Sequence, residues 1–216
     1  MKDETFTDKV RKHFGYLETE YEFRLISEGN SEIRPETDGV VKYGSNNTLI
    51  LIDSETGQAA VRFVRTQDDE RYYLDPVSIH EYLITNEEEK KILLSRDIRD
   101  DDAAKEVFSR AFLLSSPGWK SSGKDIYADL ENQLKKYANW LKENAELCLL
   151  GDFSQWPAFY EYKINRLIAE ELRRGGKEVV LAVVKDEHGV FKSIERPIFQ
   201  RERDHLSKLK KEVLGN

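Results

Sequence analysis

Cysteine is almost absent from this chain, which has Cys148 as its single thiol among 216 residues. One cysteine cannot form an internal disulfide or supply a cysteine-based metal cluster. The thiol lies in the apolar run Ala145–Leu150, which predicts a buried, unreactive side chain rather than a nucleophile. The chain begins Met1-Lys2-Asp3-Glu4 without the apolar stretch of a secretion signal, so we expect a reducing, cytoplasmic location.

Long apolar runs and several catalytic motifs are absent as well. No stretch of about 18 apolar residues is present, so we predict no membrane-spanning helix. The histidines have no second ligand at metal-binding spacing, so we predict no zinc site and no cofactor. No Gly-x-Ser-x-Gly elbow occurs, and Ser121–Asp125 lacks the preceding glycine and the following hydroxyl residue of a phosphate-binding P-loop.

Charge is unbalanced towards acid: 34 basic and 41 acidic residues give a net charge of -7. This balance opposes a general attraction to nucleic acid or to an anionic membrane, so we expect neither as a partner. A basic protein partner is compatible with the acidic surface, and so is solubility alone. The composition does not indicate an oligomeric state.

The length fits one large domain or two small ones, and the 39% of apolar residues can fill a core without disulfides or metals. We predict a single domain over residues 1–216. The alternative is a boundary within residues 86–102, where charged runs flank a short apolar patch. No internal repeat of fixed period argues for an array of units.

The first half of the sequence predicts one helix and then an antiparallel meander. Apolar side chains recur at helical spacing from about Thr5 to Glu20. Strand-like runs follow, separated by segments rich in turn-forming residues; they lie around residues 23–25, 40–43, 48–53 and 59–65. Thr48–Ile52 lacks alternation, which predicts a central strand buried on both faces. A further strand at residues 72–74 is predicted before Asp75-Pro76, an N-cap and first position of a short helix.

The second half predicts helices followed by a hairpin and a last helix. A capping signal at residues 122–125 opens a long amphipathic helix that reaches about Ala145. Another helix runs from Pro157 to the stop at Gly175. Two β-rich runs, 177–184 and 190–194, should pair, and residues 199–214 continue as a charged helix. The predicted fold class is therefore α+β, with helices covering an antiparallel sheet.

One set of residues has the composition of an active site. Asp152, Glu161 and Lys163 match the order used by metal-dependent nucleases, in which carboxylates hold a divalent cation and a lysine helps to activate water. That chemistry needs Glu161 and Lys163 on one side of a strand. On the helix predicted from Pro157, residues two apart point about 200° away from each other, so we expect no catalysis there. A nuclease or phosphoesterase stays as an alternative hypothesis.

The loop before that helix is the predicted binding site. Asp152, Phe153 and Trp156 lie close together there, and tryptophan in a loop can anchor a protein interface. A third hypothesis is a ligand-binding regulatory domain, in which aromatic residues such as Tyr72, Tyr73 and Trp156 line a pocket.

The segment Phe14–Phe23 resembles the opening of a loose group of uncharacterised bacterial proteins. In that group an amphipathic helix ending in a Leu-Glu-x-x-Tyr-Gly-Phe-like run leads into an antiparallel meander, often in toxin-immunity neighbourhoods. The resemblance covers the first third of the chain and departs at Glu22, where glycine is usual. It implies a small α+β protein with an immunity-like role and supplies no functional residue. The leading interpretation is therefore a non-enzymatic bacterial protein that binds another protein, such as an immunity or antitoxin-like protein.

Overall fold

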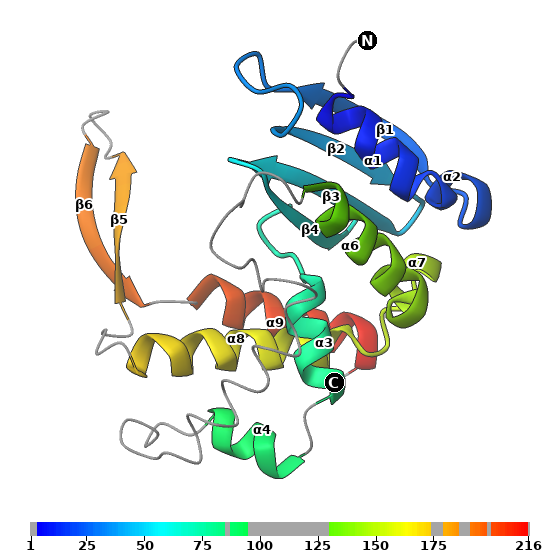
Figure 1. Cartoon of the computed structure of the whole chain (residues 1–216). Helices are drawn as coiled ribbons and strands as arrows, with labels where there is room; N and C mark the ends of the chain where they lie inside the picture. Colours follow the sequence, from blue (N-terminus) through cyan, green and yellow to red (C-terminus); the bar gives the residue numbers. More distant parts are fainter. Residues whose placement is uncertain are drawn as a thin grey trace. The chain divides into compact units, whose positions relative to one another are not determined.

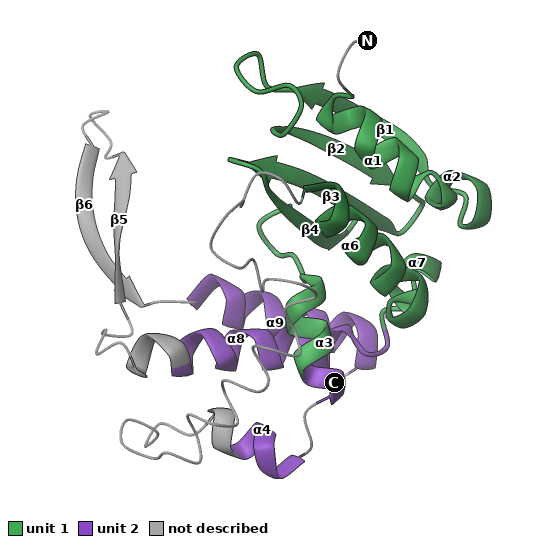
Figure 2. Ribbon diagram, in the orientation of Figure 1, with its two compact units in different colours: residues 1–81, 113–153 green, residues 82–112, 154–216 purple. Residues whose placement is uncertain are grey.

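The computed structural model describes residues 4–84, 87–94, 130–173, 179–185, 191–197 and 200–215. The chain divides into two compact units, which Figure 2 shows in different colours. Unit 1 contains residues 1–81 and 113–153, and unit 2 contains residues 82–112 and 154–216. Of the interval 86–102, where a boundary was the alternative, the structure describes only the helix over residues 87–94.

Unit 1 is built on an antiparallel meander of four strands in the order β1-β2-β3-β4 (Figure 1). The strands are β1 (Arg24–Asn30), β2 (Gly39–Gly44), β3 (Thr48–Glu55) and β4 (Gln58–Arg65). Each strand pairs with the next one in the sequence, because the connecting segments are short enough for hairpins. The predicted meander is confirmed, and with it the α+β fold class.

The register of the sheet places one row of apolar side chains across all four strands. Tyr43 lies opposite Leu25 on one side and Ile50 on the other, and Ile50 lies opposite Phe63. Tyr43, Ile50 and Phe63 are fully buried, which makes this the core face of the sheet. On β3, neighbouring residues Leu51 and Ile52 are both buried, so the prediction of a strand buried on both faces is confirmed.

Helices α1 (Phe6–Phe14) and α6 (Leu130–Asn144) pack on that sheet, and α1 also packs against α6. Both are amphipathic, since Phe6, Val10 and Phe14 of α1 and Leu134 and Leu141 of α6 are buried. The predicted helix over residues 5–20 is interrupted at Gly15, after which the short helix α2 (Tyr16–Glu20) follows. The predicted start of the long helix, before Leu130, lies outside the described residues.

A short helix, α7 (Glu146–Leu150), follows α6 and brings Cys148 into the core. Cys148 is 2% exposed, which confirms the predicted buried thiol, and its carbonyl accepts a hydrogen bond from the Thr48 hydroxyl at 2.9 Å. Gly151 then adopts φ 75°, the left-handed conformation that ends many helices. The contact between Cys148 and Thr48 fixes α7 at the start of β3.

The segment after β4 differs from its prediction. Residues 72–74 form no strand; Leu74 makes a single bridge to Phe63, with hydrogen bonds of 2.7 and 2.8 Å between their backbones. The reason is the next element: Asp75 caps α3 (Pro76–Ile84) by accepting from the Ser78 amide at 2.8 Å, which leaves no room for a longer ladder. The predicted capped helix is thus confirmed, and the predicted strand is wrong.

Unit 2 contains the helices α4 (Glu87–Leu94), α8 (Trp156–Arg173) and α9 (Gln200–Leu214) and an antiparallel pair, β5 (Val179–Lys185) and β6 (Phe191–Pro197). These match the predicted helix, hairpin and final helix. Helix α8 packs against both α9 and α4. An edge-to-face contact joins α8 to α9, since the Tyr160 ring lies 5.1 Å from the His205 ring at an angle of 71°. Within the described ranges, every helix is too short or too polar to cross a lipid bilayer.

Candidate functional site

The three residues of the predicted binding loop have different environments. Asp152 is exposed and its amide donates to the Leu147 carbonyl at 2.8 Å, while the Arg65 guanidinium lies 5.7 Å from the centre of the Phe153 ring. Trp156 is the first residue of α8 and is 2% exposed. Asp152 and Phe153 belong to unit 1 and Trp156 to unit 2. Their role in binding stays a prediction.

The residues that match a nuclease motif lie in a geometry that disfavours metal-dependent catalysis. Glu161 and Lys163 both lie on α8, which is a helix, so their side chains diverge as expected for residues two apart. The Glu161 carboxylate forms an ion pair with Lys210 of α9 at 2.9 Å. Among the described residues, no three histidine, cysteine, aspartate or glutamate side chains gather closely enough to hold a metal ion.

The aromatic residues of the third hypothesis belong to different units. Tyr73 is half-buried in unit 1, where the Arg62 guanidinium lies 5.3 Å from the centre of its ring. Trp156 is a core residue of unit 2. The described residues do contain a pocket, but other side chains line it.

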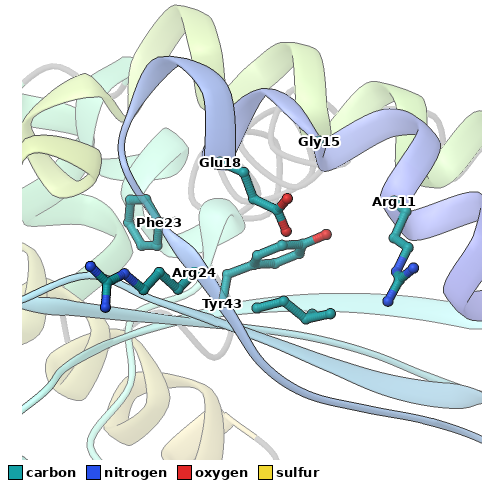
Figure 3. Close-up of a pocket in the computed structure, with 7 residues that line it drawn as sticks. Arg11, Gly15, Glu18, Phe23, Arg24 and Tyr43 are labelled. Atoms are coloured by element: carbon teal, nitrogen blue, oxygen red, sulfur yellow. The ribbon is translucent and has the colours of Figure 1, made fainter.

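This pocket has a volume of about 470 Å³ and lies in unit 1 where α1 meets α2, above the first residues of β1 (Figure 3). A volume of this size is typical of small-molecule sites. Two helices and two strands contribute to it; the lining residues are Arg11, Gly15, Glu18, Phe23, Arg24, Leu25 and Tyr43. We call it the Tyr43 pocket.

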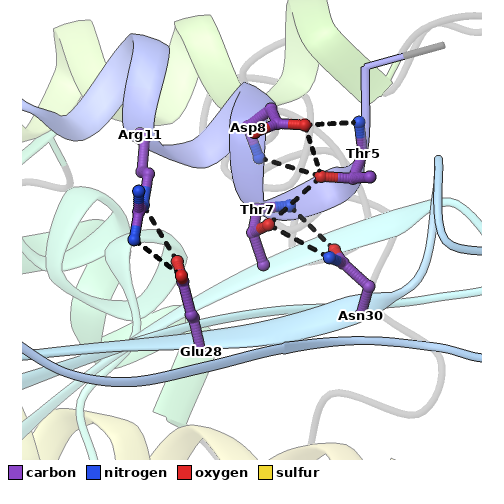
Figure 4. A network of polar contacts seen from close by, with 6 residues as sticks. All are labelled: Thr5, Thr7, Asp8, Arg11, Glu28 and Asn30. Atoms are coloured by element: carbon purple, nitrogen blue, oxygen red, sulfur yellow. Dashed lines mark hydrogen bonds and ion pairs between the residues drawn. The ribbon is translucent and has the colours of Figure 1, made fainter. Parts of the chain in front are cut away.

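The helical wall of the pocket is fixed to the sheet by polar contacts of α1 (Figure 4). Thr5 and Asp8 form a capping box at the start of α1. Two hydrogen bonds join the first turn of α1 to the end of β1. The Asn30 side chain accepts from the Thr7 amide at 3.0 Å and donates to the Thr7 hydroxyl at 3.1 Å. At the other end of α1, Arg11 donates to both carboxylate oxygens of Glu28 at 2.9 and 2.6 Å.

The short helix α2 is held in place by contacts with α6. The Tyr16 hydroxyl donates to the Ala138 carbonyl at 3.2 Å, and Lys142 pairs with Glu20 at 3.0 Å. At the joint, the Gly15 amide donates to the Arg11 carbonyl at 3.0 Å, and a Cβ at this position would come within 2.9 Å of the same oxygen. The wall that carries Glu18 is therefore fixed on both sides of the joint.

The base of the pocket is Tyr43, whose side chain belongs to the buried row of the sheet. Tyr43 is 0% exposed, and its hydroxyl has no hydrogen-bond partner among the described residues. A buried hydroxyl without a partner costs about 1–3 kcal/mol, so folded proteins rarely keep one without a reason. Burial raises the pKa of Tyr43 to about 12, with the Glu18 carboxylate adding to the effect, so the phenol is neutral at physiological pH.

The charged side chains that line the pocket differ in whether they point toward Tyr43. In Figure 3 the Glu18 carboxylate extends toward the Tyr43 ring, whereas the Arg24 guanidinium points away from both. Phe23, which is 2% exposed, supplies an apolar wall. The pocket thus combines a neutral phenol, a carboxylate and an apolar surface, which is a set suited to binding and has no nucleophile paired with a base.

Sequence reasoning did not find this site. Gly15, Glu18 and Phe23 lie inside the segment Phe14–Phe23 that carries the resemblance, but no chemistry was assigned to them. The available signal is Tyr43 itself. Residues two apart on a strand face the same side, so Tyr43 shares the buried face of Val41, and a buried tyrosine hydroxyl needs a hydrogen-bond partner.

Comparisons with protein-family models, with curated proteins and with solved structures find no match for the chain.

Proposed function

We propose that this protein is a non-enzymatic binding module and that the Tyr43 pocket is its binding site. The observation that carries the proposal is that Tyr43 lines the cavity while its buried hydroxyl has no partner among the described residues. A ligand group that hydrogen-bonds to this oxygen would remove the desolvation cost that the unliganded protein bears. Phe23 and Leu25 would cover the apolar part of such a ligand.

The fixed walls support binding in preference to a purely structural role for the cavity. Independent contacts hold α1 on β1 and α2 on α6, so the pocket is formed before a ligand arrives. Preformed pockets avoid the entropy cost of ordering loops on binding.

The experiment is a titration of small probes into the full ¹⁵N-labelled chain, followed by amide chemical shifts. Butylammonium, butyrate and 1-butanol share one carbon skeleton and differ in charge. We expect at least one of them to shift the amides of Gly15, Leu25 and Tyr43, and Tyr43→Phe to weaken that binding about fivefold through the lost hydrogen bond. Tyr73→Phe is the matched control because Tyr73 is also a partly buried tyrosine of unit 1 but does not line the pocket. If no probe of any charge shifts these amides, the proposal fails.

A protein partner, the leading hypothesis from the sequence, is a second candidate. The observation that favours it is β1, which pairs on one side only within the described residues and whose side chains are exposed apart from the half-buried Leu25. An edge strand can accept a strand from another protein, and Ile26, which is 61% exposed, would contact it.

Its test is a pull-down with matched variants. We expect Ile26→Lys to lose a partner that the unmodified chain and Ile33→Lys both retain, since Ile33 is 88% exposed but lies outside β1. Equal recovery with both variants would exclude β1 as the contact.

A further inference from the structure

The charges around Tyr43 indicate which kind of ligand the pocket takes, and this inference rests on the proposed function. Three charged groups act on the Tyr43 hydroxyl: the carboxylates of Glu18 and Glu28 and the guanidinium of Arg11. Arg11 and Glu28 form a two-point ion pair with each other, so their charges largely cancel. The remaining charge next to the hydroxyl is the Glu18 carboxylate.

Glu18 has no ion-pair partner among the described residues, although it is exposed and close to several basic side chains in the sequence. Arg24 also lines the pocket, but its guanidinium extends away from Glu18 and Tyr43 in Figure 3. The pocket therefore presents a carboxylate whose charge is not neutralised beside a phenol oxygen whose hydrogen-bonding capacity is unused.

A neutral phenol donates one hydrogen bond and also accepts through its lone pairs, whereas a carboxylate only accepts. A ligand group with several N–H donors and a positive charge can donate to both the phenol oxygen and the carboxylate. The Tyr43 and Phe23 rings add favourable surroundings for a cation, and the apolar wall formed by Phe23 and Leu25 suits a methylene stem. An anionic group beside the Tyr43 hydroxyl would instead face the Glu18 carboxylate, because the Arg24 guanidinium points away from that position in Figure 3.

We infer that the Tyr43 pocket binds an alkylammonium or alkylguanidinium group, with its charged head between the Glu18 carboxylate and the Tyr43 hydroxyl and its stem against Phe23 and Leu25. The volume of about 470 Å³ exceeds what the charged head alone needs, so the stem and further atoms fit as well. The same chemistry is found in a free amine and in a lysine or arginine side chain of a polypeptide.

The test compares the three probes of equal skeleton on the full chain and on two variants of equal charge. We expect butylammonium to bind at least about tenfold more tightly than butyrate and 1-butanol, and Glu18→Gln to remove that preference. Glu22→Gln is the control: Glu22 is also exposed and close in sequence, but it does not line the pocket.

The outcomes separate the inference from the proposed function. Butyrate or 1-butanol binding as tightly as butylammonium would overturn the inference and leave the pocket as a binding site. Butylammonium binding that Glu18→Gln leaves unchanged, or that Glu22→Gln weakens equally, would also overturn it. Failure of all three probes would instead remove the proposed function itself.

Two further probes distinguish the sources of the cation. Agmatine, which carries both an ammonium and a guanidinium group, represents a free amine, and N-acetyl-lysine amide represents a lysine within a polypeptide. Binding of the blocked lysine as tight as that of butylammonium assigns the pocket to a side chain of a partner, whereas binding of agmatine alone assigns it to a free amine.

Discussion

Replacing Tyr43 by phenylalanine should make the protein more stable while it weakens ligand binding. The substitution keeps the buried ring and removes one oxygen that has no partner among the described residues. Leaving such a hydroxyl buried costs about 1–3 kcal/mol. We expect a gain of about 1 kcal/mol, the lower end of that range, because Tyr43 lines a cavity and is not wholly surrounded by close-packed atoms.

Tyr16→Phe provides a control of opposite sign in the same unit. Tyr16 is also buried, at 8% exposure, but its hydroxyl donates to the Ala138 carbonyl at 3.2 Å. Removing that hydrogen bond should lower the free energy of unfolding by about 0.5–1.5 kcal/mol. Two buried tyrosines that differ in one hydrogen bond thus predict changes in opposite directions.

The assay is urea unfolding of each variant, followed by the NMR signals of amides in unit 1. Following unit 1 by itself matters because two compact units need not unfold together. A shift of the midpoint at constant slope reports a change in stability. If Tyr43→Phe lowers the midpoint as Tyr16→Phe does, the Tyr43 hydroxyl has a partner in solution, and the reasoning from its burial is refuted.

Three other predictions concern unit 1. Burial raises the pKa of Tyr43 to about 12, above the ordinary value near 10, so the folded chain keeps a proton that the unfolded chain loses. The free energy of unfolding should therefore fall as the pH rises from about 10 to 12. Tyr43→Phe should make that part of a urea-measured stability profile less steep, while the raised pKa values of the buried Tyr16 and Tyr73 keep part of the slope. Asp68→Ala removes the carboxylate that pairs with Arg65, where both side chains are at most 2% exposed, and should cost about 3–5 kcal/mol in the same assay. The exposed Asp69→Ala should cost under about 1 kcal/mol, and equal losses would contradict the assignment to burial. Glu22 has φ 58°, so Glu22→Gly should raise the thermal midpoint relative to Glu22→Ala, and an equal midpoint would show that the backbone there is unstrained.

Much of the fold could be predicted because its signals are local. Alternating and continuous apolar runs located the four strands of the meander, and the Asp75 cap located the start of α3. The interruption at Gly15 was missed because the apolar stripe continues through it into α2. Residues 72–74 were predicted as a strand from their composition, whereas the turn at Tyr72 and the cap at Asp75 limit the pairing to one bridge.

The site was less predictable because it depends on register. Glu18 and Tyr43 come together only when β1 pairs with β2 so that Leu25 lies opposite Tyr43. The register of this pair shifts between Leu25 and Ser27, an irregularity that no periodicity in the sequence reveals. Position 22 is different: Glu22 has a positive φ, a conformation that glycine adopts without steric cost.

The division of unit 1 between two stretches of sequence affects how it is made. Gln133 of α6 accepts from the Ala59 amide at 3.1 Å and donates to the Gly57 carbonyl at 3.2 Å, so α6 completes the hairpin of β3 and β4. The ribosome, however, must add roughly 80 residues after β4 before α6 is complete, which takes on the order of 4–16 s at typical rates of synthesis. During that time the nascent sheet lacks the helix that covers β4, and its apolar side chains are open to chaperones or to neighbouring chains.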